Sequence, residues 1–345
     1  MTDEVLVRAE HICKYFKIGG GRMLHAVEDV NLDIHRGETL GLVGESGCGK
    51  STLGRTLMGI YQPTKGKLIY DGKPVDLSNK KDRFAFAKKA QIVFQDPGSS
   101  LNPYQDVRSI LSLPLKVHKV VPKNEIDDKI LEILEMVELP ADFMYKSPNS
   151  IGGGEKQLVS IARALCCNPK FIILDEPTSS LDVSIQAKII NMLIKLKKEQ
   201  NLTYMFITHD MGVVADIADR VAVMYAGQIV EYGTVEEIFY DAWHPYTWAL
   251  LQALPQLGTK GEALPTIDGT PPNLFNEIKG DAFAPRNKHA LAIDFVAEPP
   301  FFQVSETHAA KTWYLDPRAP KMERPHSIQN LREKMGKMGG SNLNG

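Results

Sequence analysis

The sequence reads Gly44-Glu45-Ser46-Gly47-Cys48-Gly49-Lys50-Ser51-Thr52 at the position that decides the fold of this chain. The stretch matches the phosphate-loop pattern G-x-x-x-x-G-K-[ST], follows the apolar run TLGLV and precedes a helical pattern over residues 50–60. The glycines let backbone N–H groups face a phosphate, toward which the following helix directs its positive dipole end. Lys50 adds a positive charge, and Ser51 can ligate Mg²⁺. A glycine-rich turn with a stray lysine is the alternative, which the strand-to-helix context disfavours.

A second apolar run, FIILDEP at 171–177, predicts a buried strand that ends in two acidic residues. Ligands at the carboxyl ends of parallel strands meet at one edge of a sheet, so these acids are expected beside the phosphate loop. Asp175 would hold Mg²⁺, through water, and Glu176 would polarise the attacking water as general base. An isolated Asp-Glu pair is more often a solvated turn, but the strand and the upstream loop favour catalysis.

Short β-rich runs alternate with helical patterns over most of the chain, which predicts an α/β fold with a mostly parallel, helix-covered sheet. The β-rich runs are VLVRAE, ETLGLVG, AQIVFQ, FIILDE, LTYMFIT and RVAVMYAG, and the helical patterns include residues 50–60, 184–199 and 211–218. With the phosphate loop, this is the fold class of P-loop NTPases of the RecA-like type. The main domain is expected over residues 1–254, with an inserted helical subdomain at about 96–170.

After Pro255 the chain is rich in proline but keeps several aromatic residues, which predicts a small folded appendage with irregular backbone over residues 255–321. The Gly, Ser and Asn content of residues 322–345 is typical of a flexible tail.

The composition excludes several classes of protein. A net charge of −2 over 345 residues and a pI near 6.5 give no reason to expect a nucleic-acid partner. The spacing of the four cysteines does not suit a metal site, which indicates a reducing compartment; they are Cys13, Cys48, Cys166 and Cys167. Apolar residues nowhere run together for the roughly 18 positions of a membrane span. We therefore expect a cytosolic protein or one docked to a membrane protein.

Four segments follow the phosphate loop in a fixed order: IVFQDP with Gln95, the run 151–165, LDEPTSSLD with Asp182, and FITHD with His209. This order resembles the ATP-binding cassette. The resemblance implies that Gln95 contacts Mg²⁺ and the membrane partner, that Asp182 belongs to the D-loop, and that His209 is the switch histidine near the γ-phosphate. The signature segment is Ile151, Gly152, Gly153, Gly154 and Glu155.

The resemblance also assigns an aromatic ring that stacks on adenine. Phe16 matches this position in Lys14-Tyr15-Phe16, and the neighbouring Tyr15 is the alternative. The expected cofactors are therefore ATP and Mg²⁺.

Three further segments narrow the resemblance to the oligopeptide and dipeptide importer ATPases: QDPGSSLNP from Gln95, the run 209–221, and HPYT from His244. The match covers residues 5 to about 320. It implies a heterodimer with a second ATPase subunit, two transmembrane permease subunits, an extracellular peptide-binding protein as an indirect partner, and a peripheral place on the cytoplasmic face of the membrane. Sister systems carry nickel complexes or other small solutes. A soluble cassette protein acting on ribosomes or DNA is the alternative from another class, and it usually has tandem cassettes or a coiled-coil insertion.

Two positions depart from the family pattern. The usual signature serine is Gly152, which either is tolerated through its backbone or makes the two nucleotide sites of a dimer unequal. In the appendage, many relatives carry a C-x-F-x-x-R-C run, where this chain has Asp281 and Asn287 in place of the cysteines. We therefore expect neither an iron–sulfur cluster nor zinc.

Overall fold

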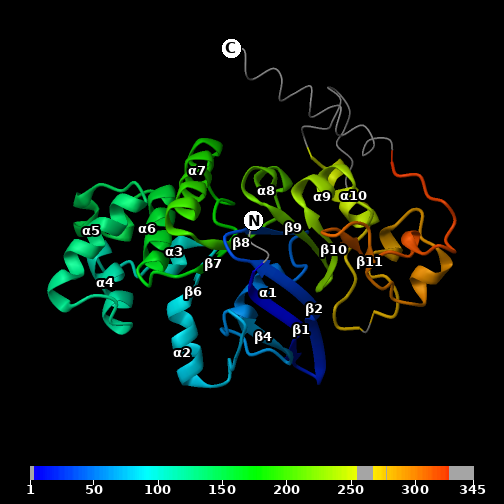
Figure 1. The fold of residues 1–345 in the computed structure, drawn as a ribbon, viewed down its shortest axis with the longest axis horizontal. Helices are drawn as coiled ribbons and strands as arrows, with labels where there is room; N and C mark the ends of the chain where they lie inside the picture. The colour runs from blue at the N-terminus through cyan, green and yellow to red at the C-terminus, as the bar shows by residue number, and fades with distance from the viewer. Residues whose placement is uncertain (1–3, 255–266, 277, 326–345) are drawn as a thin grey trace, which may run out of the picture.

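The computed structural model describes residues 4–254, 267–276 and 278–325 (Figure 1). Its larger sheet has eight strands in the order β11-β12-β10-β9-β3-β8-β7-β6. The five strands from β9 to β6 pair in parallel, as predicted, and the others pair antiparallel. The strands are β3 (Thr39–Val43), β6 (Ala90–Val93), β7 (Phe171–Asp175), β8 (Thr203–Thr208), β9 (Arg220–Tyr225), β10 (Gln228–Thr234), β11 (Phe302–Gln303) and β12 (Ala309–Ala310).

Strand β7 shows how this sheet separates two hydrophobic cores. Every residue of β7 is buried, which is typical of a parallel strand covered on both faces. Because side chains alternate along a strand, Ile173 joins the core beneath the phosphate loop, whereas Ile172 and Leu174 join the core made with the helices. The acidic end of β7 is thus fixed from both sides.

A second, antiparallel sheet has four strands in the order β2-β1-β4-β5, with β1 (Val5–Ile18), β2 (Arg22–His35), β4 (Lys65–Tyr70) and β5 (Lys73–Val75). The run VLVRAE lies in β1, so its assignment to the parallel sheet was wrong. A three-residue turn joins β1 to β2, and Gly20 and Gly21 adopt positive φ in it. Such a short connection permits only antiparallel pairing, since a parallel pair needs a crossover of about a dozen residues.

The helices that flank the parallel strands lie close to their predicted ranges: α1 (Lys50–Leu57), α7 (Val183–Gln200) and α8 (Met211–Ile217). Helix α1 ends before residue 60 because Gly59 adopts φ +68°, a left-handed conformation that stops a helix. Helix α2 (Lys80–Lys89) leads into β6.

The segment between β6 and β7 is helical and forms one end of the molecule in Figure 1. It contains α3 (Pro97–Ser100), α4 (Val107–Val117), α5 (Ile126–Met136) and α6 (Gly153–Leu165), with short 3₁₀ turns at Lys123–Glu125, Ala141–Tyr145 and Pro148–Ser150. Its apolar residues pack against α7 and one face of the large sheet in a single core. None of the helices within the described ranges is long and apolar enough to cross a bilayer.

The C-terminal part packs on the opposite end of the sheet (Figure 1). It begins with α9 (Val235–Tyr240) and α10 (Pro245–Gln252), followed by 3₁₀ turns at Ala284–Arg286, Ala292–Phe295 and Trp313–Leu315. Strand β12 pairs with β10, and Phe283 and Tyr314 join the core that contains Tyr246 and Trp248. The appendage predicted over 255–321 and the predicted flexible tail lie partly outside the described residues.

Candidate active site

A cavity of about 890 Å³ lies where the parallel strands end. Gly44, Glu176 and His209 directly follow β3, β7 and β8, which are neighbours in the sheet, so their side chains and backbones meet at one edge. The lining residues are Phe16, Leu24, Ala26, Gly44, Glu45, Ser46, Gly47, Gly49, Lys50, Ser51, Thr52, Gln95, Glu176, Ser179, Ser180, His209, Leu250 and Leu274.

The loop 44–52 has a backbone that only glycine can provide at two positions. Gly44 and Gly49 adopt φ +154° and +110°, and a Cβ at either would lie 2.1 Å and 2.3 Å from the carbonyl oxygens of Met224 and Ala26. Helix α1 begins at Lys50 without a side-chain cap, so its first N–H groups are free to bind an anion at the cavity. The buried Lys50 Nζ donates hydrogen bonds to the carbonyl oxygens of Gly44 at 2.7 Å and Glu45 at 3.0 Å.

Ser51 and Asp175 form a pair beneath the loop. Ser51 Oγ donates to Asp175 Oδ1 at 2.7 Å, while Oδ2 is buried without a hydrogen-bond partner among the described residues. Arg55 Nη2 lies 3.7 Å from Oδ2. Burial raises the pKa of Asp175 above its ordinary value, and the Ser51 hydrogen bond opposes this shift.

This pair fits a magnesium ion bound together with a nucleotide. Mg²⁺ takes one or two protein oxygens and completes its shell with phosphates and waters. Within the described ranges, no three His, Cys, Asp or Glu side chains are grouped to hold a metal by themselves. The unpartnered Oδ2 and the adjacent hydroxyl are the oxygens that such an ion would use.

The carboxylate of Glu176 is held between two polar side chains. Gln95 Nε2 donates to Glu176 Oε2 at 2.9 Å, and His209 Nδ1 lies 3.3 Å from Oε1. Glu176 adopts φ +47°, which is unusual for a residue with a side chain, and its N–H donates to the carbonyl of Ile207 at 2.9 Å. Such backbone conformations are maintained where the surrounding structure enforces them, as at active sites.

Of the two neighbouring aromatic residues, Phe16 is the one that lines this cavity. Its ring meets Tyr61 edge-on at 5.3 Å, and Lys14 Nζ lies 4.8 Å from its centroid. Tyr15 points elsewhere: its hydroxyl donates to Glu28 Oε1 at 2.5 Å, and its ring stacks on His25.

The signature and D-loop residues do not line this cavity. Gly152 is the N-cap of α6, where its N–H donates to Glu155 Oε2 at 2.7 Å, while Ile151, Gly153 and Gly154 flank it. Asp182 Oδ1 caps α7 by accepting from the N–H of Ile185 at 3.0 Å. Their place outside this cavity leaves open which nucleotide they contact.

The Cys48 side chain does not line the cavity either, although its backbone is part of the loop. The thiol is buried, and burial raises its pKa.

Several residues at the site were missed from the sequence. Four of them, Leu24, Ala26, Ser179 and Ser180, line the cavity. Leu250 and Leu274 also line it, and the carbonyl of Leu274 accepts from the N–H of His25 at 2.9 Å. Tyr246 and Arg286 both bond to Glu45. The sequence pointed to Tyr246 and Arg286 only indirectly. Both lie in segments, HPYT and the run 281–287, that were compared with the family pattern.

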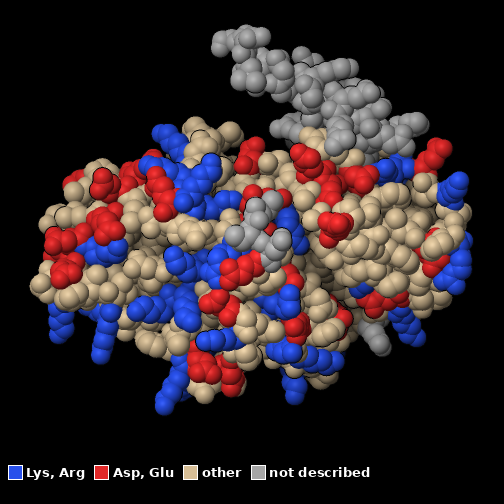
Figure 2. Space-filling view, viewed as in Figure 1, with Lys and Arg blue, Asp and Glu red and all other residues tan. Residues whose placement is uncertain are grey.

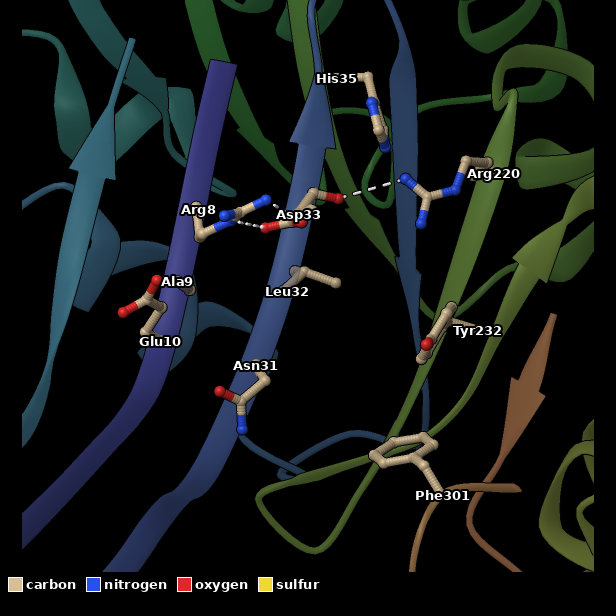
Figure 3. A pocket seen from close by; sticks show the side chains of 10 residues that line it. All are labelled: Arg8, Ala9, Glu10, Asn31, Leu32, Asp33, His35, Arg220, Tyr232 and Phe301. Atoms are coloured by element: carbon tan, nitrogen blue, oxygen red, sulfur yellow. Dashed lines mark hydrogen bonds and ion pairs between the residues drawn. The ribbon is translucent and has the colours of Figure 1, made fainter. Parts of the chain in front are cut away.

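A separate cavity of about 450 Å³ lies between β1, β2, the strands β9 and β10, and Phe301 (Figure 3). Its charged groups are paired: Arg8 forms a fork with the Asp33 carboxylate at 2.8 and 2.9 Å, and Arg220 Nη1 donates to the Asp33 carbonyl at 3.2 Å and to Glu38. The predicted site residues all lie outside this cavity, so the nucleotide site is the larger one.

Residues 27–179 match the ABC transporter family, and residues 230–293 match the C-terminal region of oligopeptide/dipeptide transporters. The chain is 44% identical to the oligopeptide transport ATP-binding protein OppD of Bacillus subtilis, covering 96% of this chain and 94% of the relative. It is 46% identical to the oligopeptide transport ATP-binding protein AmiE of Streptococcus pneumoniae, covering 97% and 98%.

Solved structures show the same fold. The cbiO1 structure from Clostridium perfringens, part of an ABC transporter complex, is 30% identical with a TM-score of 0.61, covering 69% of this chain and 92% of that one. The ATP-binding cassette MJ0796, in a dimeric post-hydrolysis state bound to ADP and Pi, is 30% identical with a TM-score of 0.60, covering 67% and 99%. The predicted fold class and family are thereby confirmed. The chain belongs to the ABC transporter family, among the ATP-binding proteins of oligopeptide and dipeptide transport.

Proposed function

We propose that this chain binds ATP with Mg²⁺ and hydrolyses it to drive peptide import through a membrane complex. One observation carries the proposal: the cavity joins the loop 44–52 to a carboxylate, Glu176, that Gln95 and His209 hold in place. A nucleotide whose phosphates lie on the loop would present its γ-phosphate toward that carboxylate. Phe16, at the same cavity, would stack on the adenine.

The protein groups have separate tasks in this reaction. The N–H groups at the start of α1 and Lys50 Nζ would bind the phosphates, and Lys50 would exchange its bonds to loop carbonyls for phosphate oxygens. Ser51, Asp175 and Gln95 would hold Mg²⁺, which supplies positive charge to the phosphate oxygens.

Glu176 would accept the proton of the attacking water. As that water forms a bond to the γ-phosphorus, the bond from phosphorus to the bridging β–γ oxygen breaks, and ADP and phosphate result. Gln95 and His209 support this step by fixing both carboxylate oxygens, and His209 would also reach the γ-phosphate.

The working unit is proposed to be a dimer with a second, related ATPase subunit. The signature segment at the start of α6 lies outside its own cavity. Apart from the N–H of Gly152, which is bonded to Glu155, the N–H groups of the first turn of α6 would be available for a nucleotide held by a partner. The dimeric state of the cassette MJ0796 supports this arrangement. Two ATP molecules would then lie between the subunits.

A groove of about 550 Å³ in the helical segment supports docking of a permease. Leu113 and Val117 of α4 line it and expose 59% and 49% of their surface. They lie four positions apart on one face of the helix and so form a small apolar patch. The groove also includes Ser100 and Asn102 of the segment that follows Gln95. We propose that a permease subunit docks here and that the complex contains two transmembrane permease subunits. This would place the chain on the cytoplasmic face of the membrane, with an extracellular peptide-binding protein as an indirect partner.

The charge distribution accords with a protein rather than a nucleic-acid partner. Figure 2 shows Lys and Arg interspersed with Asp and Glu on the face in view, and the net charge is −2. A nucleic-acid site would need clustered cations.

We also propose a division into an ATPase domain over residues 1–254, with a helical subdomain at about 96–170, an appendage over 255–321 and a C-terminal segment over 322–345, most of which lies outside the described residues. The uninterrupted run of helices between β6 and β7 supports the subdomain.

Reconstitution tests the function. The chain is produced with the permease and ATPase subunits encoded beside it, purified in detergent and placed in proteoliposomes with the peptide-binding protein. Uptake of a labelled peptide that requires ATP and this chain is expected, and a nickel complex serves as competing cargo. ATP hydrolysis without any association with permeases would contradict the proposal.

A further inference from the structure

Arg286 connects the C-terminal part to the phosphate loop. Its side chain is only 3% exposed, and all five guanidinium N–H groups have an acceptor. Nη1 and Nη2 donate to the two carboxylate oxygens of Glu45 at 2.6 and 3.0 Å. Nε donates to the carbonyl of Asp268 at 2.9 Å, Nη2 also donates to that of Ile267, and Nη1 also donates to the hydroxyl of Tyr225.

Glu45 is held from a second direction through its backbone. Its N–H donates to the hydroxyl of Tyr246 at 2.7 Å, and Tyr246 is fully buried. The Glu45 carbonyl accepts from Lys50 Nζ at 3.0 Å. Contacts therefore run without interruption from Arg286 through Glu45 to the lysine that faces the phosphates.

The charges of Glu45 and Arg286 would directly affect the binding of ATP. Glu45 lines the nucleotide cavity, and an unpaired carboxylate there would repel a highly charged anion. The fork with Arg286 neutralises that charge and fixes the position of the carboxylate. A forked pair of this kind requires arginine, because lysine presents a single ammonium without the planar geometry.

We propose that Arg286 is a positioning residue of the nucleotide site, which neutralises Glu45 and holds the phosphate loop in its binding conformation. It acts through Glu45 and does not touch the nucleotide. The inference rests on the proposed binding of ATP, and it makes the C-terminal part a determinant of ATP affinity.

Titration of the complete chain with fluorescent ATP and ADP analogues tests this role. We expect R286M to raise the Kd for ATP about tenfold, equivalent to 1.4 kcal/mol, and the Kd for ADP less, because ADP carries less charge. R286K keeps the charge but loses the fork, so its Kd should be intermediate. The matched control is R318M, since Arg318 is 84% exposed and forms a surface fork with the nearby Asp316.

A second substitution, at Glu45, distinguishes an electrostatic effect of Arg286 on ATP binding from a loss of folding. E45Q/R286M should bind ATP more tightly than R286M, because the repelling charge is gone, and melting temperatures are measured in parallel. An R286M Kd within twofold of that of wild type, or no rescue by E45Q, would overturn the inference. If R286M does not fold, R286K takes its place, and an R286K Kd equal to that of wild type would overturn the inference. Failure of the wild-type chain to bind ATP would instead overturn the proposed function, and this inference with it.

Discussion

Gln95 and Glu176 are joined by a hydrogen bond of 2.9 Å from the amide Nε2 to the carboxylate Oε2, although 81 residues separate them. Gln95 lies just after β6, where the chain enters the helical segment, and Glu176 follows β7. The groove proposed for the permease is lined by Gln91 and Ser100, which lie on either side of Gln95 in the chain. A displacement of the helical segment would therefore move a direct hydrogen-bond partner of the proposed general base.

Replacement of Glu176 by glutamine should leave ATP binding intact and lower the ATPase rate of the assembled complex about tenfold to hundredfold, because an amide cannot accept the water's proton and only the slower site on the partner's phosphate loop would remain. Turnover and nucleotide Kd are measured on the same preparation. The matched control is E199Q, since Glu199 is an exposed residue of the same side-chain length on α7. A wild-type rate for E176Q would refute the assignment of Glu176.

The strands that form this site could be predicted because their signal is local. TLGLV and FIILD are short, mostly apolar runs, and a glycine or an acidic residue follows each of them. Such runs are typical of buried parallel strands. VLVRAE has an equally clear strand pattern, but its sheet depends on which strand it pairs with, and that pairing is a property of the folded chain. Local patterns therefore identified β1 as a strand and placed it in the wrong sheet.

The contact between Arg286 and Glu45 could not be predicted for the same reason. The residues are 241 positions apart, and the fork forms because the chain around Phe283 packs against Tyr225 of β9 and Tyr246 of α10. Glu45 occupies a position that the phosphate-loop pattern leaves open, so the motif did not single it out.

His244 and Asp281 lie against each other at the junction of α10 and the C-terminal part, with His244 Nε2 3.9 Å from Asp281 Oδ2. Burial lowers the pKa of His244 from 6.5 to about 4, against the opposing effect of Glu231. Burial raises the pKa of Asp281 from 3.8 to about 6, against a hydrogen bond from the N–H of Phe283.

These two pKa shifts make the folding stability depend on pH in opposite directions. Only the unfolded chain protonates His244 between pH 6.5 and 4, so stability is lost as the pH falls through that window. Only the unfolded chain ionises Asp281 between pH 3.8 and 6, so stability is lost as the pH rises there. Each contribution amounts to about 3 kcal/mol at 1.36 kcal/mol per pKa unit.

Urea unfolding of H244N and D281N across pH 4 to 7 measures the two contributions separately. Asparagine can still accept from the N–H of Tyr246 at the N-cap of α10, and from the N–H of Phe283 in D281N. Relative to wild type, H244N should gain stability as the pH falls, and D281N should gain stability as the pH rises. The pKa shifts would be contradicted if the free energy of unfolding of both variants, relative to wild type, changed in the same direction with pH, or if neither changed with pH.

Metal analysis of the purified protein should find neither iron nor zinc at stoichiometric amounts. Asp281 and Asn287 stand at the cysteine positions of the family's C-x-F-x-x-R-C run, and the sequence has no cysteine after Cys167. Both side chains are engaged, since Asp281 Oδ1 accepts from the N–H of Phe283 and Asn287 Nδ2 donates to the hydroxyl of Tyr314 at 3.0 Å. One metal ion or cluster per chain that survives dialysis against chelator would refute this prediction.

The last prediction concerns Gly152, which replaces the serine of the family signature. One side-chain donor to the partner's γ-phosphate is missing, and a charge-assisted hydrogen bond is worth roughly 1.5–3 kcal/mol, a tenfold to hundredfold effect. Because a signature segment serves the nucleotide of the other subunit, the site on the partner's phosphate loop should be slow. The site built on Lys50, Glu176 and His209 should carry most of the turnover. The alternative is that the backbone of Gly152 suffices and both sites cycle equally.

The structure allows the missing hydroxyl to be restored. Gly152 adopts φ −71° and ψ 171°, which any residue can adopt, and an added Cβ would meet only Glu155 Oε2, at an ordinary 3.7 Å. By contrast, a Cβ at Gly154 would lie 2.6 Å from Ile185. Serine at 152 is therefore accommodated, and it can also cap α6.

Two measurements on the assembled complex decide between these alternatives. Inactivating Glu176 should abolish most ATPase activity, whereas inactivating the partner's catalytic glutamate should have little effect. In the E176Q background only the partner's site can turn over, and there G152S should raise the rate about tenfold or more, while G152A, which adds the Cβ without the hydroxyl, should not. Equal losses from the two glutamates, or equal effects of G152S and G152A, would mean that the backbone alone serves the partner's γ-phosphate and that the two sites are equivalent.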